Sequence, residues 1–213
     1  MNETFNLISL CKLEGIAPSD INVQANQFVF RQGESAEYLY YIIEGEVKTS
    51  ALSIHGREGV TAILKSGEFF GEFSLSNRTS YLLSAKTITS SRILKIEKTK
   101  AALLVKNCAE FSTYFLNFML DRNAAIQSDF ADQLFNSSEK RLARFLLQLA
   151  SYGTEEKMKV VAPQVSQSVL AAKIGTTRSQ INIFMNKFRD LGLIEYNGDI
   201  KVHPSLISIV IGE

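Results

Sequence analysis

The uneven placement of glycine and proline constrains the fold more than any other feature of the sequence. Between about residues 22 and 100, glycines recur between short segments rich in β-branched and aromatic residues. From Lys100 to Phe135 there is neither Gly nor Pro, which is what a long helical stretch requires. The first pattern is typical of an antiparallel β-sandwich or barrel, and the second predicts a long helix after it. The expected strands are Gln27–Arg31, Tyr38–Ile43, Val47–Leu52, Val60–Leu64, Ser80–Ala85 and Arg92–Ile96.

Length and composition limit the classes of protein that fit. The chain has 213 residues, 46 % hydrophobic and 21 % charged, which is the profile of a globular protein with one large or two small domains. Apolar residues at helical spacing over 5–17, before Pro18, predict a short helix. The absence of a basic leader and of an apolar run of roughly 18 residues predicts no membrane contact and a cytoplasmic location. Cys11 and Cys108 have neither CxxC spacing nor a nearby His, so we expect reduced core thiols.

Charge is distributed unevenly along the chain. The net charge of +1 does not by itself indicate a nucleic-acid partner. Residues 1–136 hold 13 Lys and Arg against 15 Asp and Glu, a net of −2, whereas residues 137–213 hold 10 against 7, a net of +3. This basic tilt weakly favours an acidic partner for the last third of the chain.

The segment 101–135 carries two apolar faces. Phe111, Phe115 and Phe118 form one of them in the first half of the segment. The other has spacings of 3, 4, 3 and 4 residues, the alternation of a coiled-coil seam with a single polar Asn. We interpret this seam as the interface between two identical chains, and packing on the β domain is the alternative. The seam consists of Leu116, Met119, Asn123, Ile126 and Phe130.

A new domain is predicted to begin at Asn136. The sequence Asn136-Ser137-Ser138-Glu139 has the form of a capping box, with Asn136 as the N-cap and Glu139 at the third helical position. Apolar residues at helical spacing follow it. A polar turn at 152–156 ends this helix, and 157–162 is predicted to be a short strand.

Residues 167–186 carry the pattern of a helix-turn-helix. Ala171 is small where two helices would cross closely, and Gly175 stands where the turn needs a left-handed backbone. Four apolar positions would hold the two helices together. Six positions agree in one register, and two ordinarily packed helices are the alternative. The apolar positions are Leu170, Ile174, Ile181 and Phe184.

A wing and a polar helix face follow this motif. Leu191–Tyr196 is predicted to end the helix and begin a strand, Asn197-Gly198 a tight turn, and Asp199–Val202 a second strand. The second helix presents polar side chains suited to phosphates and base edges. Arg178, near its start, is the candidate for bidentate contact with guanine, and a phosphate contact is the alternative. The candidate DNA-binding residues are Thr176, Thr177, Arg178, Ser179, Gln180, Asn182 and Lys187.

With a glycine-punctuated β-roll, a long helix and a winged helix-turn-helix in this order, the chain resembles the Crp/Fnr family of transcription regulators. The resemblance implies an α+β fold: an N-terminal antiparallel β-roll of the cyclic-nucleotide-binding type (1–100), a dimerisation helix (101–135) and a C-terminal winged helix-turn-helix (136–213). It also implies a homodimer that binds double-stranded DNA at a palindromic operator and contacts RNA polymerase. The resemblance is carried by Arg31-Gln32-Gly33-Glu34, Tyr40-Tyr41-Ile42-Ile43-Glu44-Gly45-Glu46-Val47, Gly67-Glu68-Phe69-Phe70-Gly71-Glu72 and Ile174-Gly175-Thr176-Thr177-Arg178.

The resemblance further places an effector site in the β-roll. Cyclic-nucleotide members of the family bind the phosphate with Gly-Glu followed, after a short loop, by Arg and a small residue. Gly71-Glu72 matches, but alignment on Ala85-Lys86-Thr87 puts Thr79 or Tyr81, not Arg78, at the Arg position. The site thus departs from the cyclic AMP pattern, and the identity of the effector stays open. The candidate effector-binding residues are Gly71, Glu72, Phe73, Arg78, Thr79, Ser80, Tyr81, Asn123 and Gln127.

Metal and enzyme chemistry lack the residues that they need. An iron–sulfur cluster takes several clustered Cys, and only Cys11 lies near the N-terminus. Haem takes axial ligands, whereas His55 and His203 fall in different predicted domains. A cupin-like metal enzyme, one alternative for the β domain, takes several His and a carboxylate. We therefore predict neither a metal site nor an enzyme. A ligand-binding module without DNA activity is the other alternative, and the intact helix-turn-helix positions argue against it.

Overall fold

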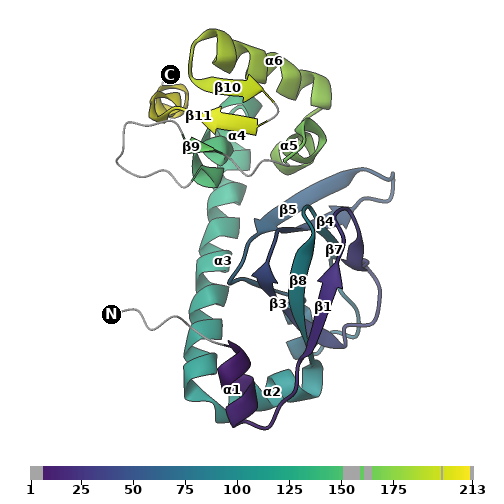
Figure 1. Ribbon diagram of the computed structural model, residues 1–213. Coiled ribbons are helices and arrows are strands. Elements are labelled where there is room, and N and C mark those ends of the chain that lie inside the picture. The colour runs from purple at the N-terminus through teal and green to yellow at the C-terminus, as the bar shows by residue number, and fades with distance from the viewer. Residues whose placement is uncertain (1–6, 151–158, 161–164, 198, 212–213) are drawn as a thin grey trace. The chain divides into compact units, whose positions relative to one another are not determined.

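The computed structural model describes residues 7–150, 159–160, 165–197 and 199–211 (Figure 1). The chain forms two compact units, Met1–Ile126 and Gln127–Glu213. Helix α3, Ala109–Phe135, runs through the boundary between them. Each unit is described in turn.

The first unit contains two four-stranded antiparallel sheets, which makes the N-terminal part a β-sandwich (Figure 1). One sheet has the strand order β1-β8-β3-β6 and the other β2-β7-β4-β5. Helix α1, Leu7–Leu13, precedes the strands. The strands are β1 Ser19–Val23, β2 Phe28–Phe30, β3 Tyr38–Glu44, β4 Val47–Leu52, β5 Glu58–Leu64, β6 Phe69–Phe70, β7 Ser84–Thr87 and β8 Ser91–Glu97, with a 3-10 helix η1 at Glu72–Leu75.

Alternation along the strands divides the apolar residues between two cores. Because successive strand residues point to opposite faces, the neighbours Phe69 and Phe70 enter different clusters, and both are fully buried. Phe70 belongs to the cluster between the two sheets, together with Tyr40 and Ile93. Phe69 belongs to the cluster that the helices α1, α2 and α3 cover. Strands β3, β6 and β8 of this sheet therefore bury side chains on both faces.

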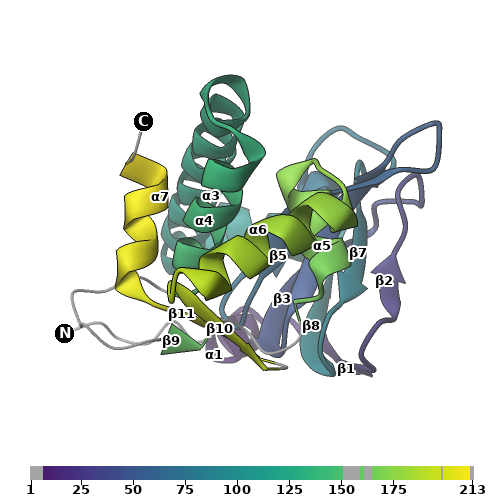
Figure 2. The same cartoon turned by 90° about the horizontal axis from the view of Figure 1, so that it is seen from above.

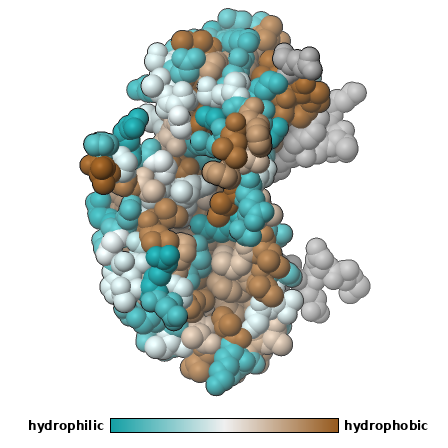
Figure 3. Space-filling model, turned by 180° about the vertical axis from the view of Figure 1, so that it is seen from behind, coloured by the Kyte–Doolittle hydropathy of each residue, from teal (hydrophilic) through white to brown (hydrophobic). Residues whose placement is uncertain are grey.

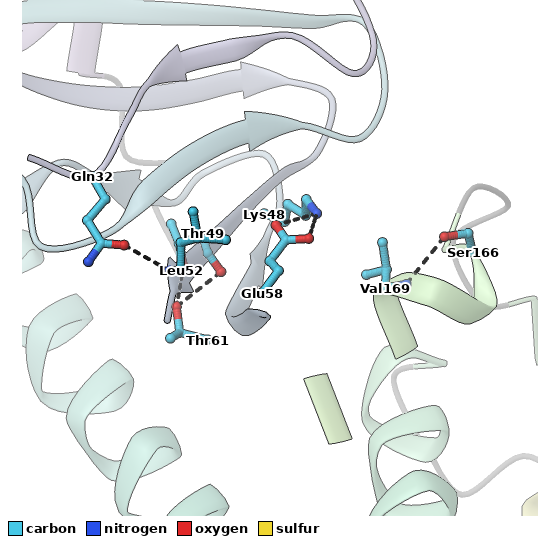
Figure 4. A network of polar contacts seen from close by, with 8 residues as sticks. All are labelled: Gln32, Lys48, Thr49, Leu52, Glu58, Thr61, Ser166 and Val169. Atoms are coloured by element: carbon cyan, nitrogen blue, oxygen red, sulfur yellow. Dashed lines mark hydrogen bonds and ion pairs between the residues drawn. The ribbon is translucent and has the colours of Figure 1, made fainter. Parts of the chain in front are cut away.

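Polar side chains also join neighbouring strands. Lys48 Nζ on β4 donates to Glu58 Oε1 on β5 at 2.7 Å, and the Thr49 and Thr61 hydroxyls lie 2.8 Å apart (Figure 4). Such cross-strand pairs help to fix the register of an antiparallel pair.

The predicted long helical stretch consists of two helices. Helix α2, Lys98–Asn107, ends at Cys108, whose backbone is extended, and α3 starts at Ala109. The break has a tertiary cause, since Leu104 before it and Phe111 after it are both fully buried in the same core. No glycine or proline marks this position, so the pattern of residues could not show it.

The second unit holds the remaining helices and a small sheet of order β10-β11-β9. Helix α4 begins after an N-cap at Ser137, whose hydroxyl accepts from Lys140 N–H, so the expectation of Asn136 as the cap is wrong. Asn136 instead donates through Nδ2 to Asp132 in the last turn of α3. The elements are α4 Ser138–Leu149, β9 Lys159–Val160, α5 Gln167–Ile174, α6 Arg178–Asp190, β10 Ile194–Asn197, β11 Asp199–Val202, η2 Pro204–Leu206 and α7 Ile207–Ile211.

Several boundaries differ from the expectations. The strand expected at 80–85 lies at Ser84–Thr87, because Tyr81 N–H donates to Glu34 O and draws residues 80–83 away from the ladder. Strands β1 and β6 were not expected, and the N-terminal helix ends at Leu13 rather than at residue 17. The expected turn at 152–156 lies outside the described residues, as does most of the strand expected at 157–162. Within the described ranges, no helix has the length and apolar character needed to cross a membrane.

Candidate functional site

Helices α5 and α6 are joined by a turn that the sequence specifies at three positions. Ser166 begins α5, its hydroxyl accepting from Val169 N–H at 3.3 Å (Figure 4). Gly175 ends α5 in the left-handed conformation, with φ 74°, and donates to Ala171 O at 2.9 Å. Thr177 begins α6 by accepting from Gln180 N–H at 3.2 Å. The turn therefore takes the left-handed backbone predicted at Gly175, where a side chain would be strained.

The inner faces of the two helices are buried as the pattern predicts. Met185 and Phe188 extend the apolar face of α6 beyond the predicted positions. Strand β10 lies beside α6 and pairs with β11 to form the wing (Figure 2). The buried positions of the motif are Leu170, Ala171, Ile174, Ile181 and Phe184.

The opposite side of α6 is exposed and holds most of the candidate DNA-binding residues. We call the exposed residues of its first ten positions the reading face. Thr177 is exposed beside it, whereas Thr176 and Gln180 are half-buried. Ile183 was missed by the sequence reasoning, although its position opposite the buried Ile181 and Phe184 could have indicated it. The reading face consists of Arg178, Ser179, Asn182, Ile183 and Lys187.

Two polar residues of the reading face already have partners within the protein. Lys187 Nζ lies 2.6 Å from Glu139 Oε1 of α4. Asn182 Oδ1 accepts from Gln167 Nε2 at 3.5 Å, a long contact. DNA would have to compete with these partners for the Lys187 and Asn182 side chains. Arg178 and Ser179 lie at the N-terminal end of α6, where the helix dipole favours a phosphate group.

Ion pairs attach the last turns of α3 to the helix-turn-helix within the second unit. Asp129 Oδ2 lies 2.5 Å from Lys173 Nζ of α5, and Asp132 pairs with Arg144 of α4. Arg141 of α4 adds a link to the motif itself, because its Nη2 donates to Ile174 O at 2.8 Å. These contacts orient α5 and α6 relative to the end of α3.

The space between the two sheets, where the resemblance places an effector, contains an aromatic cluster. Tyr81 is 3 % exposed and stacks on Phe30 with ring centroids 3.7 Å apart. Its hydroxyl donates to Tyr38 O at 2.8 Å and accepts from Tyr38 N–H at 3.1 Å. Burial, and after it the neighbouring Tyr81 phenol, raises the pKa of Tyr40. Burial also raises the pKa of Tyr81, so both phenols are neutral at physiological pH. The Tyr81 side chain therefore forms part of the core of the β-sandwich.

Gly71 lies next to this cluster, and Glu72 follows it as the first residue of η1. Gly71 has φ 75°, and a Cβ there would come 2.9 Å from both Tyr38 O and the Tyr40 ring, so only glycine fits. Glu72 Oε1 lies 3.7 Å from Arg122 Nη2 of α3, and both side chains are largely buried. Arg122 also donates to Phe69 O at 3.2 Å. Sequence reasoning missed Arg122, which follows Phe111, Phe115 and Phe118 on one helix face.

The remaining candidate effector residues do not converge on one point. Arg78 and Thr79 are exposed, Phe73 is half-buried, and Ser80 forms a bridge with Ser35. Asn123 and Gln127 are exposed on α3, and Gln127 belongs to the second compact unit. The structure thus places Gly71 against Tyr40 in the aromatic cluster that also contains Tyr81. The Glu72 side chain instead pairs with Arg122 of α3.

The residues expected at a dimer seam are largely exposed on α3. Met119 is half-buried and Asn123 exposed. Two further leucines, which the sequence reasoning did not include, belong to the same exposed surface. Hydrophobic side chains also reach the surface on the face of the molecule drawn in Figure 3. The apolar residues of α3 that are more than half exposed between Leu116 and Leu134 are Leu116, Leu120, Ile126, Phe130 and Leu134.

Histidine and cysteine show no metal-binding arrangement. Among the described residues, no group of three or more His, Cys, Asp or Glu is placed to hold a metal ion. His55 is exposed, and His203 Nδ1 accepts from Ser205 N–H at the start of η2. Cys11 is buried, and burial raises the pKa of its thiol to about 11, with a further contribution from Cys108. Such a thiol is chemically inert.

A helix-turn-helix with a hairpin wing defines a DNA-binding protein of the winged-helix class. Two family models match the chain: the cyclic nucleotide-binding domain at residues 20–108 and the Crp-like helix-turn-helix domain at residues 140–204. The chain belongs to the Crp/Fnr family of transcription regulators.

Relatives and solved structures agree with this assignment. The chain is 29 % identical over 197 residues to the CRP-like cAMP-activated global transcriptional regulator of Mycobacterium tuberculosis, covering 87 % of this chain and 88 % of the relative. It is 28 % identical over 187 residues to the anaerobic regulatory protein of Bacillus subtilis, covering 85 % and 78 %. Its fold resembles that of the c-di-GMP responsive global regulator CLP of Xanthomonas campestris, with a TM-score of 0.78 at 21 % identity, covering 92 % and 98 %. The structure of FixK2 from Bradyrhizobium japonicum has a TM-score of 0.78 at 16 % sequence identity, covering 91 % of this chain and 96 % of FixK2.

Proposed function

We propose that the protein regulates transcription as a homodimer that binds a palindromic operator through the reading face of α6. The observation that carries this proposal is the exposed N-terminal half of α6, held by a buried inner face and by Thr177 as N-cap. In a symmetric dimer, two such helices would enter successive major grooves, with half-sites about 34 Å apart. The proposal includes the division into sensor (1–100), dimerisation (101–135) and reading (136–213) segments, contact with RNA polymerase as in the family, and action in the cytoplasm.

The exposed apolar residues of α3 support the dimer. Leu116, Leu120, Ile126, Phe130 and Leu134 are each more than half exposed. The seam residues Leu116, Met119, Asn123, Ile126 and Phe130 follow at spacings of 3, 4, 3 and 4. That alternation is the requirement for a two-stranded coiled coil. A second copy of the same helix supplies the matching surface, because a two-fold interface uses the same residues on both chains.

We further propose that the β-roll does not bind cyclic AMP in the usual manner of the family. Three observations support this. The Tyr81 side chain occupies the space between the sheets, Arg78 is exposed, and Glu72 pairs with Arg122. A phosphate would need an unopposed cation and open space at this point. An effector of this protein therefore differs from cyclic AMP, which activates the M. tuberculosis relative.

Selection of bound sequences from a pool of random duplexes tests the operator proposal. We expect recovery of an inverted repeat, and recovery of no repeat would contradict the dimeric mode of binding. Leu116→Glu should shift the sedimenting species from dimer to monomer and weaken operator binding by at least tenfold. The matched control is Leu103→Glu, since Leu103 is a half-exposed leucine of α2, outside the seam. A dimer that survives Leu116→Glu and Phe130→Glu together would refute the α3 interface.

A further inference from the structure

Ile183 is the unusual residue of the reading face. All residues of α6 are described, and among its apolar members Ile181, Phe184, Met185 and Phe188 are buried, whereas Ile183 is 55 % exposed. A single exposed apolar residue is ordinary on a protein surface. The position of this one on the helix face that meets DNA sets it apart.

The neighbours of Ile183 on α6 are polar. Ser179, four residues before it, is exposed, and Asn186, three residues after it, is half-buried, so both are neighbours of Ile183 on the helix surface. Asn182, beside it, has a contact with Gln167 of α5. Ile183 thus presents a branched apolar group from the middle of a surface that is otherwise suited to hydrogen bonding.

Only one base offers a matching apolar group in the major groove. Thymine carries a 5-methyl group there, while the other base edges present donors and acceptors. Ile183 lies five residues beyond Arg178, a rise of about 7.5 Å along the helix, so the two side chains reach different base pairs. Lys187 and Asn182 are already paired within the protein, which leaves more of the base discrimination to these two positions.

We propose that Ile183 is a specificity-determining residue that packs on the 5-methyl group of a thymine in each operator half-site. This inference rests on the proposed operator binding and adds the chemistry of one base position to it. The position read by Ile183 requires a T·A pair because of its methyl group, whereas the position read by Arg178 requires a guanine because of its two acceptors.

Replacement of single thymines by deoxyuridine tests the inference, because it removes only the methyl group. In the selected operator, each thymine is replaced in turn, symmetrically in both half-sites. One buried methyl is worth about 0.8 kcal/mol, which is about fourfold in affinity for each half-site. We expect one symmetric pair of thymines whose replacement weakens binding roughly fifteenfold, and little change elsewhere.

The matched variants are Ile183→Ala and Leu191→Ala, since Leu191 is an equally exposed apolar residue just after α6. Ile183→Ala should lose the response to deoxyuridine at that pair and keep its fold, whereas Leu191→Ala should keep the response. A flat deoxyuridine scan on a bound inverted repeat, or a response that persists in Ile183→Ala, would overturn the role of Ile183. Failure to select any inverted repeat would instead overturn the operator proposal itself.

Discussion

Replacement of Tyr81 by phenylalanine isolates the hydroxyl group that completes the core of the β-sandwich. The variant keeps the ring and its stacking on Phe30, so packing is preserved. It removes the donor to Tyr38 O at 2.8 Å and the acceptor for Tyr38 N–H at 3.1 Å. A buried group left without its partner costs about 1–3 kcal/mol, and because Tyr38 is half-buried we expect a loss of about 2 kcal/mol in unfolding free energy.

Urea denaturation followed by tyrosine fluorescence measures this loss, and the chain contains no Trp to mask the signal. The midpoint temperature of thermal unfolding should fall by about 4–8 °C, since a loss of 1 kcal/mol lowers it by roughly 2–4 °C in a chain of this size. Tyr114→Phe is the control: its hydroxyl donates to Gly67 O at a longer 3.2 Å from a half-buried position, so its loss should be smaller. A Tyr81→Phe variant as stable as the parent protein would refute the account of Tyr81 as a core residue.

Four further predictions concern three single residues and one ion pair. Gly175→Ala should cost about 1–2 kcal/mol of unfolding free energy, because φ 74° is strained for an L-residue; a neutral result in urea titration would contradict this. A double-mutant cycle of Asp129→Asn with Lys173→Met should show about 1 kcal/mol of coupling in the free energy of unfolding. Strictly additive effects of the two substitutions would show that the ion pair does not stabilise the fold. Burial raises the pKa of Glu46, and its Oε2 is buried with no hydrogen-bond partner among the described residues. The folded state therefore resists ionisation of this carboxyl and loses stability as pH rises above about 4.5. Glu46→Gln should be more stable than the parent at pH 7 but not at pH 4, and equal stability of the two proteins at both pH values would argue against it. Arg178→Ala should weaken operator binding by roughly 1–3 kcal/mol and relax one base position, whereas equal loss on all sequences would indicate a phosphate contact.

The sequence was sufficient for the elements that have strong local signals. The helix-turn-helix followed from the small residue, the glycine and four apolar positions, each of which has a local physical reason. Most β-strands followed from alternating apolar residues between glycines. Strand β6 could not be predicted, because Phe69-Phe70 is too short to show a period, and the break at Cys108 arises from burial of Leu104 and Phe111 rather than from a helix-breaking residue.

The effector region was less predictable for a geometric reason. A shift of one residue between positions 78 and 81 exchanges a side chain that points into the sandwich for one that points to solvent, so alignment alone could not decide which residue enters. The structure places Tyr81 inside and leaves Arg78 exposed. Arg122 was missed because its partner Glu72 is 50 positions away in the chain, beyond the reach of any local pattern.

Titration of the selected operator with the purified protein, with and without cyclic AMP, tests the central claim most directly. Fluorescence anisotropy gives the affinity, and sedimentation of the same complex gives the number of chains per duplex. We predict two chains on one inverted repeat, with an affinity that changes less than twofold when cyclic AMP is present at saturating concentration. One chain per duplex, or a gain of tenfold or more with cyclic AMP, would contradict the account.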